Sequence, residues 1–234
     1  MGNGDIPKVL VMLKNKPLIL YLLHELEQHQ LSYPVVVVGY KAAQVKGVLG
    51  ENYVYAFQEE QKGTAHAVMA ARSYVNAENI LVLYGDMPFI KAKSLKRLMS
   101  LHRDKNSELS MFTALAPNFS GEFESLDSYG RIIRDAAGNL VKITEYKDAT
   151  EADRRILEVN PGIYMFNTRW LWENIDKIKN YNAQNEFYLT DLIEIAIRGK
   201  IDIRSLPIEP REVLGINTPR AAETVRKICI NILF

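Results

Sequence analysis

The nine residues LVLYGDMPF, 81–89, run from an apolar segment into a carboxylate, as a core strand does where it leaves a sheet. An ionised side chain at that point is costly to desolvate unless a cation, a hydrogen-bond donor or water meets it. In open α/β sheets, ligands bind beyond the carboxyl ends of the strands, where Asp86 would lie. The position predicts either a metal-binding or catalytic carboxylate, or an aspartate that forms the turn before Met87 and Pro88.

Segments with helical and strand patterns alternate on both sides of this stretch. Apolar residues recur at helical spacing over 18–26, and the β-branched run YPVVVVGY, 33–40, follows. Alternation of this kind is typical of a parallel sheet covered by helices. We therefore expect an α/β fold with a Rossmann-like, mostly parallel sheet flanked by helices. The other segments expected in this half are a strand over 52–57, a helix over 64–74, a helix over 92–105 and a strand over 109–116.

The pattern changes after Pro117. GRIIRDAAGNLVKITEY, 130–146, predicts two short strands joined by a turn, a hairpin instead of a crossover. We expect one domain over 1–234, made of a first part (1–116), a second part with the hairpin (117–215) and a terminal helix (216–234). The remaining expected segments are a strand over 160–167, helices over 168–178 and 189–199, and a strand over 201–208.

Composition excludes several classes of protein. With 47% hydrophobic and 24% charged residues, the 234-residue chain is typical of a globular protein. Its 29 basic and 28 acidic residues nearly cancel, which gives no general case for nucleic acid as a partner. The single cysteine, Cys229, excludes an intrachain disulfide. No apolar stretch approaches the roughly 18 residues that span a bilayer, so we expect no membrane partner and a cytoplasmic location.

A second motif, QEEQKGTAHAV, 58–68, places Gln58 at a strand end and Gly63 at the start of a helix. A primary amide both donates and accepts hydrogen bonds, so Gln58 can match the edge of a nucleobase. Taken alone, the motif favours a plainer alternative, a helix capped by Thr64 with His66 as a packing residue.

Three further polar residues can contribute to a site. Lys8 follows a proline that fixes the local backbone, so its ammonium can be held toward phosphate oxygens. Glu145 and Asn160 lie at the ends of predicted strands, where they can form hydrogen bonds with sugar hydroxyls or an amide. Each alone is explained equally well by a solvated surface or a turn.

Eight segments occur in one order along the chain: IPKVL, QEEQKGTAHAV, LYGDMPFI, YGRIIRD, EYKDAT, EVNPGIY, NAQNEFYLTD and EVLGIN. Together they resemble the sugar-1-phosphate nucleotidyltransferase family, and most closely the pyrophosphorylase domain of N-acetylglucosamine-1-phosphate uridyltransferases. The resemblance implies an enzyme that joins UTP to N-acetylglucosamine 1-phosphate, forms UDP-N-acetylglucosamine, releases pyrophosphate and uses Mg²⁺. It also implies that the part over 1–116 binds the nucleotide and that the part over 117–215 binds the sugar.

Matching positions imply a role for each site residue. One carboxylate and one amide suffice for Mg²⁺, because the ion keeps waters and uses nucleotide phosphates as further ligands. The implied magnesium ligands are Asp86 and Asn217, and the implied phosphate-binding residue is Lys8. The nucleotide-binding residues are Gln58, Gly63, Thr64, Tyr84 and Gly85, and the sugar-binding residues are Gly130, Glu145, Asn160 and Thr190.

The sequence departs from the family at its start. The family opens with a mid-sheet strand and a loop of the form L-A-A-G-x-G-T-R-M, and neither is present here. Aligning Met1 with the methionine of that loop predicts that the sequence begins at an internal methionine. The missing loop would cradle the triphosphate, so we expect poor or absent turnover, and the missing strand predicts two unpaired sheet edges.

Two other departures have smaller consequences. Asn185 replaces a common family glycine, and we expect it to adopt the left-handed backbone that asparagine tolerates. No hexapeptide repeat is present, so acetyl transfer is not predicted.

Other functions stay open to different degrees. The same fold can serve another sugar 1-phosphate or nucleotide, and the missing loop favours a non-catalytic UDP-sugar-binding protein. A nicotinamide-dependent oxidoreductase lacks support because no G-x-G-x-x-G motif follows a strand.

Overall fold

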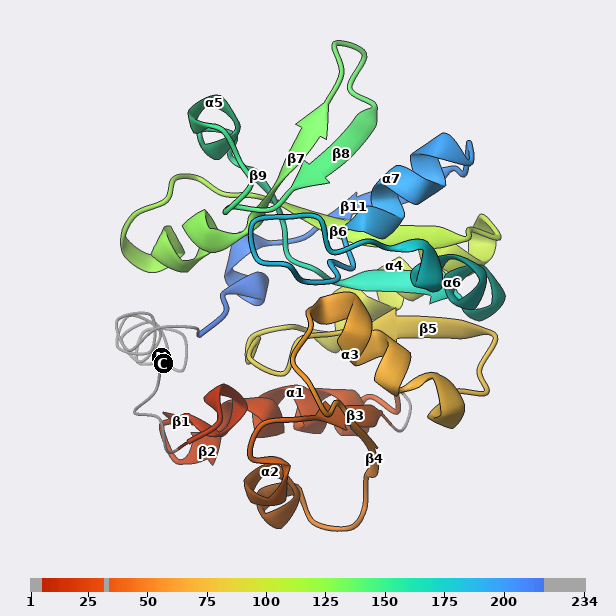
Figure 1. The fold of residues 1–234 in the computed structure, drawn as a ribbon. Helices are drawn as coiled ribbons and strands as arrows, with labels where there is room; N and C mark the ends of the chain where they lie inside the picture. Colours follow the sequence, from red (N-terminus) through yellow and green to blue (C-terminus); the bar gives the residue numbers. More distant parts are fainter. Residues whose placement is uncertain (1–5, 32–33, 217–234) are drawn as a thin grey trace.

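Figure 1 shows the chain in a computed structural model, which describes residues 6–31 and 34–216. The α-helices are α1 (Leu18–Gln28), α2 (Ala42–Leu49), α3 (Thr64–Ala70), α4 (Ala92–Asp104), α5 (Glu151–Arg154), α6 (Thr168–Asn174) and α7 (Asp191–Arg198). The strands are β1 (Met12–Leu13), β2 (Lys16–Pro17), β3 (Val35–Val38), β4 (Val54–Phe57), β5 (Asn79–Val82), β6 (Leu109–Leu115), β7 (Gly130–Arg134), β8 (Leu140–Thr144), β9 (Glu158–Asn160), β10 (Tyr164–Asn167) and β11 (Ile203–Pro207). Short 3-10 helices are η1 (Lys8–Leu10), η2 (Arg72–Tyr74), η3 (Gly121–Ser128), η4 (Ile175–Lys177) and η5 (Pro210–Val213).

The expected α/β fold with a central sheet and flanking helices is confirmed, but the strand directions are more mixed than expected. The seven-stranded sheet has the order β5-β10-β6-β9-β7-β8, and β11 pairs with β6. β11 runs parallel to β6, whereas β10 is antiparallel to both of its neighbours. Alternating helices and strands give a parallel sheet where successive strands lie side by side. Here β10 lies between β5 and β6 and is antiparallel to both.

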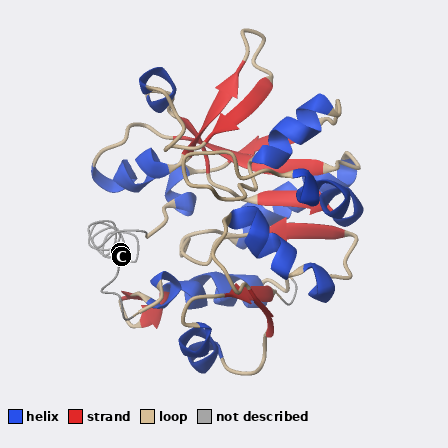
Figure 2. Ribbon diagram, in the orientation of Figure 1, coloured by secondary structure: helices blue, strands red, loops and turns tan. Residues whose placement is uncertain are grey.

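Helices cover both faces of this sheet, as Figure 2 shows in blue and red. Consecutive side chains of β6 point to opposite faces, so that Phe112 joins one core and Met111 the other. The core of Phe112 includes residues of α1 and α4, and the core of Met111 includes residues of α3, α6 and α7. None of the helices in the described ranges has the length and apolar character needed to cross a membrane.

A second, parallel pair, β3 and β4, lies apart from the large sheet. Among the described residues, β3 pairs only with β4 and β5 pairs only with β10. Helix α1 packs on both parts: Leu23 contacts the core around β3, and Leu26 belongs to a core of the large sheet.

Most predicted segments are present, with some boundaries changed. The hairpin is confirmed, and Gly138 takes a positive φ of 85° in its turn. The strand expected over 160–167 is wrong at its start, because Gly162 takes a φ of 73° and separates β9 from β10. The helices expected over 64–74 and 168–178 each end earlier and continue as a 3-10 turn. The predicted terminal helix and Cys229 lie outside the described residues.

Candidate active site

Asp86 lies in the loop after β5, near Lys8 at the start of η1. A Cβ on Gly85 would lie 3.1 Å from Cγ1 of Val9 and 3.5 Å from Cδ1 of Ile19, so a larger residue would require Val9 of η1 to shift. The charge of Lys8 acts to lower the pKa of the Asp86 carboxyl group. Burial is the larger effect and raises the pKa of Asp86 overall.

The segment that leads toward position 217 also reaches Asp86. The Ile216 N–H donates to the Asp86 carbonyl oxygen at 3.2 Å. Upstream, the Tyr129 hydroxyl donates to Val213 O at 2.7 Å and accepts from the Gly215 N–H at 3.1 Å. Asn217 itself lies outside the described residues. Tyr129 was not identified from the sequence, because its contacts come from residues more than 80 positions away.

The donor chemistry at Asp86 fits a divalent cation. Its carboxylate is desolvated, and among the ion pairs of the described ranges none includes Asp86. A desolvated carboxylate that keeps its charge requires a positive partner. Mg²⁺ prefers oxygen ligands of this kind, and Asp86 is the described residue that would hold it.

Gln58 directly follows β4 and is held by three hydrogen bonds. Its backbone N–H donates to Val38 O at 2.7 Å. Its side-chain Nε2 lies 3.2 Å from Gly63 O and 3.0 Å from His66 Nδ1. The expectation that His66 only packs is therefore incomplete, because its ring nitrogen contacts a predicted nucleotide-binding residue.

The loop before α7 lies directly against the Gly63–Thr64 turn. Gly63 has a φ of 106°, and a Cβ there would lie 2.6 Å from Phe187 O. The Leu189 N–H donates to Thr64 Oγ1 at 2.9 Å. The alternative that Thr64 caps α3 is wrong, because Gly63 is the N-cap residue. In the same loop, Asn185 has a φ of 55°, as expected.

The predicted sugar-binding residues gather at the base of the hairpin. Thr190 Oγ1 donates to Glu145 Oε1 at 3.0 Å, and burial raises the pKa of Glu145. Gly130 lies beside this carboxylate: a Cβ there would be 3.5 Å from Glu145 Oε2, an ordinary contact distance, and 3.0 Å from Ile143 Cγ2. Asn160 fixes the turn that follows it: its Oδ1 accepts from the Gly162 N–H at 3.0 Å, and its Nδ2 donates to Tyr164 Oη at 2.7 Å.

Tyr84 joins the two groups of residues. Its side chain hydrogen-bonds Thr64, and burial together with the charges of Glu145 and Asp86 raises its pKa. The Tyr84 ring lies against Gly162, where an added Cβ would be 2.2 Å from Cε2. The structure thus brings the described members of the predicted site together through this tyrosine. They are Lys8, Gln58, Gly63, Thr64, Tyr84, Gly85, Asp86, Gly130, Glu145, Asn160 and Thr190.

Asp191, at the start of α7, gives the stability of the protein a predicted pH dependence. Burial, with smaller contributions from Glu194, Glu145 and Asp148, raises its pKa from 3.8 to about 6. The folded chain therefore binds a proton more tightly than the unfolded chain, and this contribution to stability is lost as pH rises through about 6. Asp191→Asn should raise the thermal midpoint at about pH 7.5, above the folded pKa of about 6, and should change it little at about pH 3, below the unfolded value of 3.8.

Thermal unfolding at both pH values tests this, with the exposed Asp202→Asn as control. An equal change at the two pH values would contradict the assignment.

Comparison with known proteins identifies the family of the chain. The family model described as nucleotidyl transferase matches residues 4–204. The chain is 44% identical over 216 residues to the bifunctional protein GlmU of Caldicellulosiruptor saccharolyticus, which covers 90% of this chain and 45% of the relative. The GlmU of Brevibacillus brevis is 39% identical over 218 residues, with 92% and 46% covered. The chain therefore spans about half the length of these curated relatives.

Solved structures with the same fold are more distant in sequence. A UDP-glucose pyrophosphorylase complexed with UDP-glucose has a TM-score of 0.73 at 16% identity, with 97% of this chain and 91% of that chain covered. A CMP:2-keto-3-deoxy-manno-octonic acid synthetase complexed with CTP has a TM-score of 0.66 at 18% identity, with 99% and 95% covered. The family match spans most of the chain and includes the described residues of the predicted site, from Lys8 to Thr190. This chain belongs to the nucleotidyl transferase family.

Proposed function

We propose that the chain is a Mg²⁺-dependent uridylyltransferase that forms UDP-N-acetylglucosamine and pyrophosphate from UTP and N-acetylglucosamine 1-phosphate in the cytoplasm. The observation that carries the proposal is the contact between two groups of polar residues through Tyr84. Thr64 and Glu145 both act on the pKa of the Tyr84 phenol; Gln58 is bonded to the Gly63–Thr64 turn, and Glu145 accepts a hydrogen bond from Thr190. A transferase that joins a nucleotide to a sugar phosphate needs both binding regions beside one reacting phosphate.

Each region has chemistry suited to its ligand. Gln58 offers an amide to a base edge, and Glu145 offers carboxylate oxygens to sugar hydroxyls or an amide. Asp86 and Lys8 lie near each other beyond β5. The Lys8 ammonium would offset charge on the α-phosphate of UTP while the sugar phosphate oxygen displaces pyrophosphate. When bound by Asp86, Mg²⁺ would supply positive charge to the same phosphates.

Pyrophosphate release from UTP and N-acetylglucosamine 1-phosphate with Mg²⁺ tests the proposal. It should be measured for this chain and for the same chain extended by the family's strand and glycine-rich loop. The extended chain is expected to release pyrophosphate with these two substrates, and this chain is expected to do so poorly or not at all. Turnover by neither chain, with UDP-N-acetylglucosamine still bound, would favour the non-catalytic binding protein instead.

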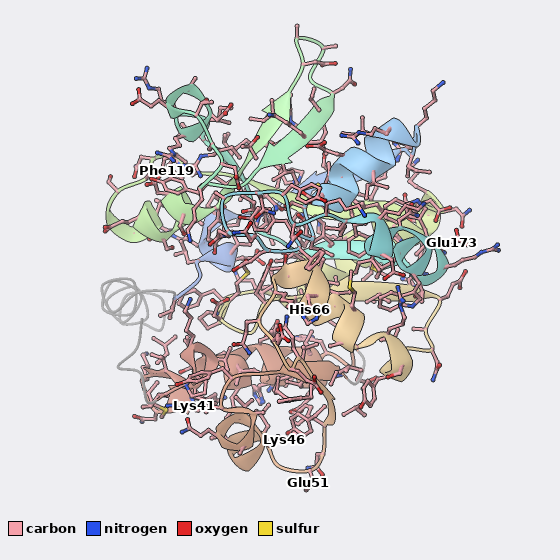
Figure 3. All side chains as sticks on the ribbon, viewed as in Figure 1. Lys41, Lys46, Glu51, His66, Phe119 and Glu173 are labelled. Carbon is pink, nitrogen blue, oxygen red and sulfur yellow. The ribbon has the colours of Figure 1, made fainter. Side chains whose placement is uncertain are left out.

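Glu145→Ala should separate the two binding regions. We expect the KM for the sugar phosphate to rise about 10- to 100-fold, because a hydrogen bond to a charged group contributes about 1.5–3 kcal/mol. The dissociation constant for UTP should change little. A matched control is Glu173→Ala, whose carboxylate lies at the outer end of α6 (Figure 3) and pairs with Arg169. Equal losses for both ligands would contradict this division of roles.

A further inference from the structure

We infer that His66 is a positioning residue that fixes the Gln58 amide with its oxygen toward the base. The site then selects a base that offers an N–H donor at that edge, uracil over cytosine. This inference rests on the proposed function, because it assumes that Gln58 contacts the base. Figure 3 shows His66 on α3.

The two contacts of Nε2 determine which way the amide points. Gly63 O is a carbonyl oxygen and only accepts, so the atom 3.2 Å from it must be the amide nitrogen. The same nitrogen lies 3.0 Å from His66 Nδ1. A primary amide nitrogen carries two hydrogens, and these two contacts use both of them. His66 Nδ1 must then accept, which requires the tautomer with its proton on Nε2.

The remaining polar atom of the side chain is the acceptor Oε1, and no hydrogen bond to a described residue uses it. Gln58 has 9% of its surface exposed, and its backbone N–H is bonded to Val38 O, so the residue is held at both ends. An immobilised acceptor of this kind is already oriented before the nucleotide arrives, which reduces the entropy lost on binding.

The two pyrimidines differ at the atom such an acceptor would meet. Uracil carries a hydrogen on N3 and donates there, whereas the N3 of cytosine is an acceptor with a lone pair. Oε1 therefore forms a hydrogen bond with uracil N3 and faces a second lone pair at cytosine N3. A site that leaves a buried polar atom unpaired rejects that ligand more strongly than the ordinary value of one hydrogen bond suggests.

Two substitutions at one position separate this role from a packing role. In His66→Leu the volume is largely kept, but the acceptor for the second amide hydrogen is lost. In His66→Asn an oxygen can take the place of Nδ1. The exposed His24→Leu on α1 serves as a control for loss of a histidine elsewhere.

Dissociation constants for UTP and CTP should be measured for the wild-type chain and the three variants. We expect the preference for UTP to fall about fivefold in His66→Leu, the value of one net hydrogen bond, and to stay near wild type in His66→Asn and His24→Leu. A packing defect would weaken the binding of both nucleotides equally and leave the ratio of the two dissociation constants unchanged. Nitrogen-15 NMR of the free protein should show His66 protonated on Nε2 and not on Nδ1.

The outcomes that overturn the inference differ from those that overturn the function. If the wild type prefers UTP and His66→Leu keeps that preference, the role of His66 is wrong while the proposed function stands. A protonated Nδ1 in the free protein leads to the same conclusion. If the chain extended by the family's strand and loop binds neither nucleotide, or if the wild type binds CTP as tightly as UTP, the uridylyl specificity itself is wrong and the inference falls with it.

Discussion

Replacing Asp86 with asparagine is expected to lower pyrophosphate release about 10²- to 10³-fold, the usual effect of removing one electrostatic group that stabilises a transition state. Folding should be spared. Burial raises the pKa of Asp86, so the folded state disfavours the ionised carboxylate. The contribution of Asp86 to stability therefore falls as pH rises through its pKa in the folded state. A neutral amide removes that cost, and the free energy of unfolding at neutral pH should therefore stay the same or increase.

The measurements are turnover, Mg²⁺ affinity by calorimetry, and thermal unfolding, made on whichever chain length releases pyrophosphate. Asp104→Asn, on the exposed side of α4, is the matched control and should leave all three near wild type. Near-normal turnover by Asp86→Asn would show that this carboxylate does not bind the metal. A large loss of stability would show instead that Asp86 has a structural partner.

Gly162→Ala should have a large effect on the fold for a substitution that adds a single methyl group. The new Cβ would lie 2.2 Å from Cε2 of Tyr84, and the φ of 73° is unfavourable for alanine. Left-handed backbone costs about 1–2 kcal/mol per residue, and overpacking adds about 1–3 kcal/mol. Tyr84 must move, and the turn held by Asn160 must move with it. We therefore expect lower stability and weaker binding of both ligands.

Gly138→Ala provides the matched comparison. Its φ of 85° is similar, but an added Cβ there meets no atom within 4 Å. Its loss of stability should therefore reflect backbone strain alone, and ligand binding should be unchanged. Chemical unfolding of both variants gives the difference, expected to be about 1–3 kcal/mol from overpacking. Equal losses in the two variants would show that contact with Tyr84 is unimportant.

The sequence predicted those features that depend on short-range patterns. The hairpin turn follows from AAGN, and the left-handed Asn185 follows from the tolerance of asparagine for that backbone. Asp86 could be identified because an ionised residue after an apolar run is unusual. The direction of β10 could not be predicted, because it depends on which strands lie beside it and not on its own residues.

The same limit applies to the site. Motif order suggested which residues form it, yet nothing in the sequence indicated that Tyr129 holds the segment before position 217. The helical position of His66 gave no sign that its ring would face Gln58, since the two belong to different elements. Thr64 has the residue type of a helix cap, but its hydroxyl accepts from Leu189, 125 positions later. Long-range contacts of this kind override local preference.

The separation of β3 and β4 from the large sheet has a consequence for how a ligand could enter and leave. Gln58 extends the small pair, whereas Glu145 follows β8 of the large sheet, and no ladder between described strands connects the two sheets. The backbone bonds that do tie these regions are few, and they include those that Phe187 makes with Lys62 and Ala65. Local opening of the region around Gln58 for a ligand would have to break these bonds and also separate α1 from one of the two cores on which it packs.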